Sequence, residues 1–227
     1  MIKPYYSEPN IKIFLEDCLE VMKELPNKSI DVILTDIPYG EVSRPSQGLR
    51  NLDKGNADIF NINLQTLLDE FYRITKSSIH IFCGHGQISE ICNYFENHNL
   101  TTRMLIWEKT NPSPMNGKVI YLSGIEKCIY GKFSGGIFNA HCRNTVFRYP
   151  TVKKKRHPTE KSLDLFKELI EISSNEQDLI LDPFLGSGTT CRAAKDLGRK
   201  CIGIEINEEY VKIAIQRLGQ GVLNFND

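Results

Sequence analysis

Short apolar runs alternate with amphipathic stretches along most of the chain, and this alternation restricts the possible folds more than any other feature. The runs are rich in isoleucine, valine and leucine, as buried β-strands are. They lie at residues 11–15, 30–34, 79–83, 104–107, 128–130, 179–181 and 201–204. Helical spacing recurs at 64–75, 87–97, 162–173, 189–197 and 208–218. The pattern predicts an α/β fold, with a doubly wound, mixed but mostly parallel seven-stranded sheet and helices on both faces.

The size of the chain favours one domain over residues 1–227, because 227 residues of which 41% are hydrophobic can bury one sizeable core. Ligands of open α/β sheets bind outside the carboxyl ends of the strands, so the loops that follow the strands are the candidate sites. Three polar segments, at 41–57, 109–117 and 131–144, are too long for simple turns. We interpret them as binding loops or lids.

Composition limits the compartment and the metal chemistry. No apolar signal segment begins the chain, and no stretch approaches the roughly 18 apolar residues of a membrane span. We therefore expect a cytoplasmic protein without a membrane partner. The seven cysteines contain no Cys-x-x-Cys pair and several lie inside apolar runs, so we interpret them as reduced packing residues and expect no metal.

Charge is distributed very unevenly along a chain whose formal net charge is zero. Between Arg103 and His157 eleven basic residues face two acidic ones, Glu108 and Glu126, so this segment carries +9 and the remainder −9. Such a segment is typical of a surface that faces phosphates, and its simpler explanation is a solvated basic face.

A glycine-containing loop follows the predicted strand at 179–181. It reads Asp-Pro-Phe-Leu-Gly-Ser-Gly-Thr-Thr at 182–190 and leads into a helical pattern. Glycines there let a ligand approach the backbone, and the helix N-terminus favours a carboxylate or phosphate. No lysine follows Gly188, which excludes the Walker phosphate loop, and no third glycine completes the usual dinucleotide motif.

An acidic residue, Glu205, ends the next predicted strand, 23 residues after Asp182. An acid at this distance is placed to accept hydrogen bonds from a ribose diol. The predicted ligand is a nucleoside with a small anionic arm, and S-adenosylmethionine fits that description. A surface acid at a strand end is the alternative.

A second motif, Thr-Asp-Ile-Pro-Tyr-Gly at 35–40, ends the predicted strand at 30–34. The Asp36 carboxylate and the Ile37 carbonyl can each accept one hydrogen of an amino group, while Tyr39 stacks on a planar base. An ordinary Asp-x-Pro turn at a strand end would look the same in isolation.

Together the two motifs resemble those of the DNA amino-methyltransferase family, with its Asp/Asn/Ser-Pro/Ile-Pro-Tyr/Phe turn and Asp-Pro-Phe-x-Gly-x-Gly-Thr-Thr loop. The turn precedes the loop, which is the permuted order of the β group. His-Pro-Thr-Glu-Lys at 157–161 resembles that group's His-Pro-Thr-Glu-Lys-Pro element, and Glu-Asp-Cys-Leu at 16–19 resembles its N-terminal Gly-Asp-Cys element. Ser162 and Ile37 replace prolines that are common in the family, and neither change removes a reacting group.

The resemblance implies an S-adenosylmethionine-dependent methyltransferase with a Rossmann-like fold that methylates N6 of adenine in double-stranded DNA by base flipping, as enzymes of restriction-modification systems do. Asp36 is the variant that the family mostly associates with adenine. The catalytic residues would be Asp36, Ile37, Pro38 and Tyr39. The cofactor-binding residues would be Asp17, Cys18, Asp36, His157, Thr159, Lys161, Asp182, Pro183, Phe184, Gly186, Ser187, Gly188, Thr189, Thr190 and Glu205.

The basic segment lies where the family keeps its target-recognition region, here a short insertion around 109–156. From this position we expect basic side chains to contact DNA phosphates. They are Arg44, Arg50, Lys54, Lys109, Lys118, Lys132, Arg143, Lys153, Lys154, Lys155 and Arg156. The family also suggests a homodimer, which no heptad or apolar stripe in the sequence demonstrates, and a place of action at the nucleoid of a prokaryotic or phage-infected cell.

Three other functions stay open at this point. The same enzyme could act on N4 of cytosine. A methyltransferase for RNA or for a protein glutamine is less consistent with Asp36 and with the permuted order of the motifs. A catalytically silent module that binds S-adenosylmethionine or DNA is disfavoured because every reacting position is filled.

Overall fold

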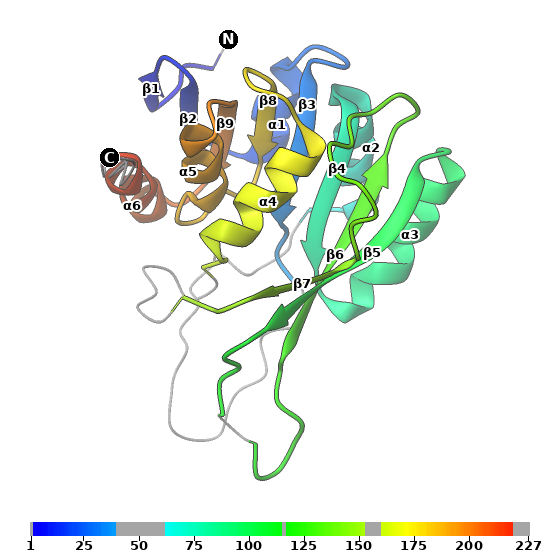
Figure 1. Cartoon of the computed structure of the whole chain (residues 1–227). Coiled ribbons are helices and arrows are strands. Elements are labelled where there is room, and N and C mark those ends of the chain that lie inside the picture. Colours follow the sequence, from blue (N-terminus) through cyan, green and yellow to red (C-terminus); the bar gives the residue numbers. More distant parts are fainter. Residues whose placement is uncertain (1, 40–61, 115–116, 153–159, 220–227) are drawn as a thin grey trace.

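The computed structural model describes residues 2–39, 62–114, 117–152 and 160–219, and these form one nine-stranded sheet (Figure 1). The strand order is β1-β2-β9-β8-β3-β4-β6-β5-β7. The strands are β1 (Tyr6–Glu8), β2 (Ile11–Leu15), β3 (Ile30–Asp36), β4 (Thr75–Cys83), β5 (Thr101–Lys109), β6 (Ile125–Lys132), β7 (Val146–Tyr149), β8 (Leu179–Asp182) and β9 (Lys200–Glu205).

Five neighbouring strands at the centre, β2, β9, β8, β3 and β4, are parallel. Strand β6 is antiparallel to both β4 and β5, while β7 is parallel to β5 and β1 is antiparallel to β2. The carboxyl ends of β2, β3, β4, β5, β8 and β9 therefore meet the beginning of β6 at one edge of the sheet, which we call the carboxyl edge.

Among the described residues, six α-helices cover the sheet, three on each face. They are α1 (Cys18–Glu24), α2 (Leu64–Ile74), α3 (Ile88–Asn97), α4 (Leu163–Ser173), α5 (Thr189–Asp196) and α6 (Glu208–Leu218). Buried residues of α1, α2 and α3 form one core cluster with the sheet, and those of α4, α5 and α6 form the other. In Figure 1, α4 crosses in front of the sheet and α1 lies behind it. Among the described residues no helix has the length and apolarity needed to cross a bilayer.

The order of the strands changes direction at β3, which makes a topological switch point at the carboxyl edge. From β3 the chain proceeds outward to β4, whereas β8 lies on the other side of β3 and leads outward to β9. Loops after β3 and β8 therefore diverge, and ligands of open α/β sheets bind at such a switch point.

The fold class predicted from the sequence is confirmed, and each of the seven predicted strands lies within an observed one. The two further strands, β1 and β7, are the outermost strands of the sheet. An edge strand is half-exposed and pairs on one side only, so it carries a weaker apolar signal; Arg148 lies within β7. The seven-residue helix α1 was also not predicted.

Candidate active site

The turn that follows β3 is held against the end of β4. The Ile37 N–H donates to the Phe82 carbonyl at 3.1 Å, and the Ile37 side chain is buried. Gln87, in the 3-10 helix His85–Gln87, donates from Nε2 to the Pro38 carbonyl at 3.1 Å. A side chain at Gly84 would place its Cβ only 3.2 Å from the Tyr39 Cβ. The predicted catalytic residues are therefore Asp36, the last residue of β3, and the three residues that follow it at the switch point.

Both carboxylate oxygens of Asp36 have partners. The Tyr39 hydroxyl donates to Oδ1 at 2.6 Å, and the Lys161 ammonium contacts Oδ2 at 2.7 Å. Lys161 Nζ also lies 3.4 Å from the Tyr39 hydroxyl oxygen. Aspartate, tyrosine and lysine, from two segments far apart in the sequence, thus form one cluster at the end of β3.

Two further charged residues complete this cluster. Glu126, near the start of β6, accepts from Lys161 Nζ at 2.6 Å with one carboxylate oxygen and contacts Lys109 Nζ at 2.9 Å with the other. Lys109 ends β5. We call Asp36, Lys161, Glu126 and Lys109 the charged cluster. Sequence reasoning did not place Glu126 in the site; the available signal was that it is one of only two acids in the basic segment.

Burial and mutual contact shift the pKa values of this cluster in opposite directions. Burial raises the pKa of Asp36, which the nearby Glu126 raises further and Lys161 opposes. Burial by itself would lower the pKa of Lys161, but the Asp36 and Glu126 carboxylates outweigh it and the pKa is raised. Burial also acts to raise the pKa of Glu126, and the two lysines overcome this so that it is lowered. The lysines therefore compensate the charge of two carboxylates in a largely dry position.

The glycine loop begins at Asp182, the last residue of β8. Asp182 is buried and accepts hydrogen bonds from the Thr35 hydroxyl at 2.8 Å, the Thr190 hydroxyl at 2.5 Å and the Phe184 N–H at 3.2 Å. Burial raises the pKa of Asp182 to about 6 against the effect of these donors. Thr35 precedes Asp36, so this contact joins the glycine loop directly to the turn at 36–39, which we call the catalytic turn after its predicted role.

Two glycines shape the loop before α5. Gly186 has φ +51° and Gly188 has φ +80°, the left-handed region that side chains disfavour. A Cβ on Gly188 would lie 2.8 Å from the Cβ of Ala214 in α6. Glu205, which ends β9, accepts from the Gly186 N–H at 2.8 Å and from the Asn207 N–H at 2.9 Å. The loop therefore turns tightly over the ends of β8 and β9.

Asp17, which the sequence predicts to bind the cofactor, follows β2 and lies beside Glu205. The Glu16 N–H donates to the Glu205 carbonyl at 3.2 Å. Asp17 itself caps α1, accepting from the Leu19 N–H at 2.8 Å. The neighbouring Cys18 is buried, and burial raises the pKa of its thiol to about 12. Asp17, Glu205, Asp182 and Asp36 thus follow one another along the carboxyl edge in the order of their strands.

Several predicted site residues lie outside the described residues: Arg44, Arg50, Lys54, Lys153, Lys154, Lys155, Arg156, His157 and Thr159. Lys161, predicted to bind the cofactor, is a member of the charged cluster and contacts Asp36 and Glu126. Ser187 and Thr189 contact the buried Arg217, whose Nη1 lies 3.0 Å from a carboxylate oxygen of Glu160.

The four described residues predicted to bind DNA are placed very differently. Lys109 belongs to the charged cluster. Lys132 ends β6 at the opposite edge of the sheet and donates to the carbonyls of Phe133 and Gly136. Arg143 is held by Glu168 of α4 at 2.6 Å. Only Lys118 is both exposed and close in sequence to the strands that reach the carboxyl edge.

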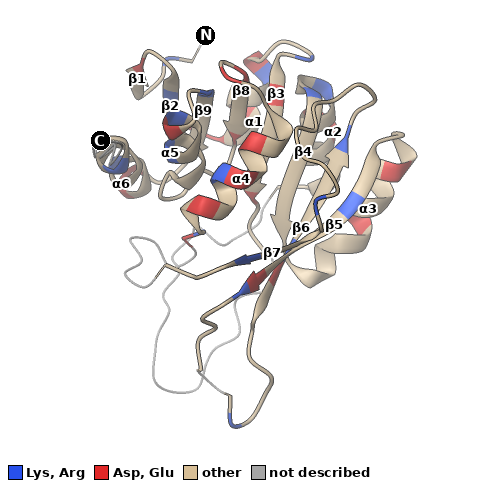
Figure 2. Ribbon diagram, viewed as in Figure 1, with Lys and Arg blue, Asp and Glu red and all other residues tan. Residues whose placement is uncertain are grey.

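Part of the positive charge counted from the sequence is therefore compensated internally. Both acids of the basic segment are paired within it, since Glu108 contacts Arg148 at 2.9 Å and Glu126 holds Lys109. Acidic and basic positions lie side by side on α4 and on β5 (Figure 2). In the described part of the chain, the basic segment does not form a single positive face.

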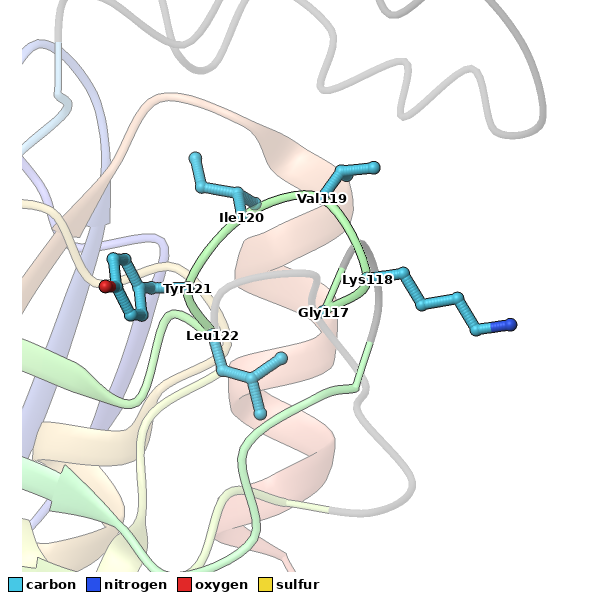
Figure 3. Close-up of a pocket in the computed structure, with 6 residues that line it drawn as sticks. All are labelled: Gly117, Lys118, Val119, Ile120, Tyr121 and Leu122. Atoms are coloured by element: carbon cyan, nitrogen blue, oxygen red, sulfur yellow. The ribbon is translucent and has the colours of Figure 1, made fainter.

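Lys118 belongs to an apolar loop between β5 and β6. Residues 117–122 line a pocket of their own, and the side chains of Val119, Ile120 and Tyr121 point away from the loop backbone (Figure 3). Tyr121 is 99% exposed and Val119 84% exposed. This pocket lies within one loop and includes none of the residues of the charged cluster or the glycine loop.

The fold and the site define a class of α/β enzymes with a nucleoside-type glycine loop and an Asp-x-Pro-Tyr catalytic turn at adjacent strand ends. The family model described as DNA methylase matches residues 137–216. The type II methyltransferase M.HinfI of Haemophilus influenzae is 31% identical over 271 residues, covering 96% of this chain and 72% of that protein. The chain belongs to this family of DNA methyltransferases.

Solved structures agree with the family. The crystal structure of the M1.HpyAVI–S-adenosylmethionine complex superposes with a TM-score of 0.72 at 30% identity, covering 92% of this chain and 100% of that one. The cytosine-N4-specific PvuII DNA methyltransferase gives a TM-score of 0.77 at 18% identity, covering 100% of this chain and 91% of that one. The second comparison concerns the fold alone. Family, fold and enzyme class thus agree with the predictions from sequence.

Proposed function

We propose that this enzyme transfers the methyl group of S-adenosylmethionine to N6 of adenine in double-stranded DNA. The observation that carries the proposal is the position of Asp36. It ends β3 at the switch point, contacts Tyr39 of the same turn, and is joined to the glycine loop through the 2.8 Å hydrogen bond between Thr35 and Asp182. A base held at Asp36 would lie next to a cofactor held by that loop.

The charge of the carboxyl edge around the glycine loop suits this cofactor, which carries a sulfonium, an ammonium and a carboxylate group. Asp17, Asp182 and Glu205 accept hydrogen bonds from N–H and hydroxyl groups, and none has an ion-pair partner among the described residues. Their negative charge is therefore available to a cation. The main-chain turn at Gly186 and Gly188 directly precedes the N-terminus of α5, where unpaired N–H groups suit a carboxylate.

The chain's own residues would bind and orient the base. The target amino group is engaged in base pairing, so the adenine must leave the duplex, which costs a few kcal/mol. Stacking on Tyr39, about 1 to 3 kcal/mol for a base on an aromatic ring, would offset part of this cost. Asp36 and the Ile37 carbonyl would then accept the two amino hydrogens and turn the nitrogen lone pair toward the methyl donor.

Positioning supplies most of the rate in this mechanism. The cofactor, when bound, supplies an electrophilic methyl group. The amino nitrogen, held by Asp36 and the Ile37 carbonyl, would accept this methyl group and would then release one proton to solvent. An exocyclic amine has too high a pKa for a carboxylate to deprotonate it beforehand, so we assign Asp36 the role of orienting acceptor.

The loop between β5 and β6 is the described surface that we propose to meet the DNA. It leaves the carboxyl edge at Lys109, returns at Ile125, and exposes the side chains of Lys118 and Tyr121. The wider region 109–156 is proposed as the target-recognition region of a single domain. A homodimer stays a prediction, which analytical ultracentrifugation would test.

Methylation of cytosine N4 is the second candidate, because a cytosine-N4-specific enzyme shares this fold. Single-molecule sequencing of DNA from cells that express the protein distinguishes the two, since it reports the modified base and its sequence context together. N6-methyladenine at a recurring site supports the proposal. N4-methylcytosine, or unmodified DNA from cells that contain folded protein, contradicts it.

A further inference from the structure

We infer that Lys161 is a positioning residue for the catalytic turn: anchored by Glu126, its ammonium group fixes one oxygen of Asp36 and leaves the other oxygen for the incoming amino group. This inference rests on the proposed function of Asp36 as the acceptor of the amino hydrogens. It assigns Lys161 to the catalytic turn, whereas the sequence motif groups it with residues of the cofactor site.

The geometry around Lys161 is that of a fixed bridge between two carboxylates. Its Nζ lies 2.7 Å from Asp36 Oδ2 and 2.6 Å from Glu126 Oε2. The side chain is only 7% exposed. Lys109 contacts the second oxygen of Glu126 at 2.9 Å, so the anchor is itself held. A buried ammonium with two carboxylate partners has little freedom to leave either of them.

The two oxygens of Asp36 differ in how easily a substrate can reach them. Oδ2 is held by a cation whose other partner is fixed. Among the described residues, Oδ1 is held only by the Tyr39 hydroxyl, a neutral donor at 2.6 Å on a residue of the same turn. An entering amino group can replace that hydroxyl as a donor without separating charges. Oδ1 is therefore the oxygen that we assign to the base.

The surroundings of Lys161 also favour this assignment over a cofactor contact. Its ammonium lies 5.7 Å from the centre of the Tyr39 ring and 5.5 Å from that of Phe82, at the end of β4. Each described partner of Nζ therefore belongs to the catalytic turn or to β4 and β6. The glycine loop, on the other side of β3, supplies none among the described residues.

The charge state of Asp36 gives the inference a measurable consequence. The titratable groups that face Asp36 come from five elements: Tyr39 after β3, Cys83 of β4, Glu126 and Cys128 of β6, Asp182 of β8 and Lys161 before α4. Lys161 lowers the pKa of Asp36 and Glu126 raises it. Removing the charge of either residue should therefore move the titration of Asp36, and the two changes should move it in opposite directions.

Two substitutions and a matched control use this opposition. Lys161→Met removes the cation, so Asp36 should protonate at higher pH, by about one pH unit or more. Glu126→Gln removes the neighbouring anion, so Asp36 should protonate at lower pH. Lys167→Met is the control: Lys167 of α4 contacts Asp196 of α5 at 2.6 Å, outside the site, so its substitution should leave the titration of Asp36 unchanged.

The deciding measurement is carbon-13 NMR of the full chain labelled at aspartate Cγ, with the Asp36 signal assigned by its loss in Asp36→Asn. Opposite displacements of the Asp36 midpoint in the first two variants, and none in the control, support the inference. An unchanged midpoint in folded Lys161→Met overturns it. Displacements of the same sign in both variants overturn it as well.

Single-turnover methylation with saturating cofactor supplies a readout that a purely structural role would not move. In Lys161→Met the rate at neutral pH should fall about tenfold or more, its acid limb should move to higher pH, and the dissociation constant of S-adenosylmethionine should stay within about twofold. A large loss of cofactor affinity with an unmoved acid limb assigns Lys161 to the cofactor site. If the wild-type chain methylates no DNA, the proposed function fails, while the NMR titration still decides the role of Lys161.

Discussion

The two halves of the carboxyl edge hold their carboxylates in different ways. In the cofactor half, at the ends of β2, β9 and β8, Asp17, Glu205 and Asp182 accept hydrogen bonds from main-chain N–H and threonine hydroxyl groups. In the catalytic half, at the end of β3 and the start of β6, Asp36 and Glu126 are held by lysine ammonium groups. The boundary between the halves is the Thr35–Asp182 hydrogen bond.

This difference matches the charges of the two ligands that we propose. N–H and hydroxyl donors fix a carboxylate without cancelling its charge, so the cofactor half stays attractive to a sulfonium and an ammonium group. Two lysines compensate two carboxylates in the catalytic half, which suits a neutral base that offers only hydrogen bonds. One edge of one sheet can thus bind a cation and a neutral base side by side.

The largest expected effect comes from the catalytic half alone. Asp36→Ala should lower the methyl-transfer rate by at least about 100-fold, because the amino group loses the acceptor that orients its lone pair. Binding of S-adenosylmethionine should stay near normal, since the cofactor half is intact. Single-turnover assays and isothermal titration calorimetry measure the two quantities. Loss of cofactor binding in this variant would show that the halves are not separate.

In the cofactor half, Gly188→Ala should cost about 2 kcal/mol or more of unfolding free energy. The left-handed backbone accounts for about 1 to 2 kcal/mol, and the 2.8 Å approach to Ala214 adds crowding. Gly198→Ala is the control, because Gly198 has φ +70° with open space around its Cβ position. Denaturant unfolding should show a larger loss at Gly188, and only that variant should weaken cofactor binding.

The pKa of Asp182, raised to about 6 by burial, predicts how cofactor binding depends on pH. A cation prefers the ionised carboxylate, so the dissociation constant of S-adenosylmethionine should rise as pH falls below about 6, by up to about tenfold per pH unit. Folding stability without cofactor depends on pH in the opposite direction. The contribution of Asp182 to the free energy of unfolding is fully present at low pH and is lost as pH rises through about 6.

Calorimetric titrations between pH 5 and pH 7 would measure this dependence. Asp182→Asn, which cannot ionise, should remove it while leaving the Asp36 side chain in place. A pH dependence that persists in Asp182→Asn would assign the proton to another group and weaken the description of the cofactor half as an ionisable cation site.

The smallest expected effect concerns the loop beyond the two halves. Lys118→Gln should weaken DNA binding by a few-fold and reduce the slope of log affinity against log salt by about one, as expected for one lost phosphate contact. Lys132→Gln, at the opposite edge of the sheet, should change neither quantity. Equal effects of the two substitutions would show that the basic segment acts through diffuse charge.

Much of the fold could be predicted because its central strands are buried on both faces and read as continuous apolar runs. Strand β3 is the clearest case, with six of its seven residues buried. The outermost strands β1 and β7 were missed because pairing on one side leaves no such run. Local motifs also predicted that the turn at 36–39 and the glycine loop each follow a strand, since each motif is contiguous in sequence.

Contacts between distant segments could not be predicted in the same way. Lys161 and Glu126 lie 35 residues apart, and Thr35 and Asp182 lie 147 apart. No periodicity encodes which strand ends become neighbours, so the charged cluster emerges only from the strand order. The same limitation affected the basic segment: its +9 charge is visible in the sequence, but the pairing of Arg143 with Glu168 of α4 is not.

The most direct test of the account is the identity of the methylated nucleoside. Duplex DNA is incubated with the purified protein and methyl-labelled S-adenosylmethionine, then digested to nucleosides and separated by chromatography with mass spectrometry. The account predicts label in N6-methyladenine with the wild-type chain, and none with Asp36→Ala protein that still binds the cofactor. Label in N4-methylcytosine, or equal labelling by the Asp36→Ala variant, would contradict it.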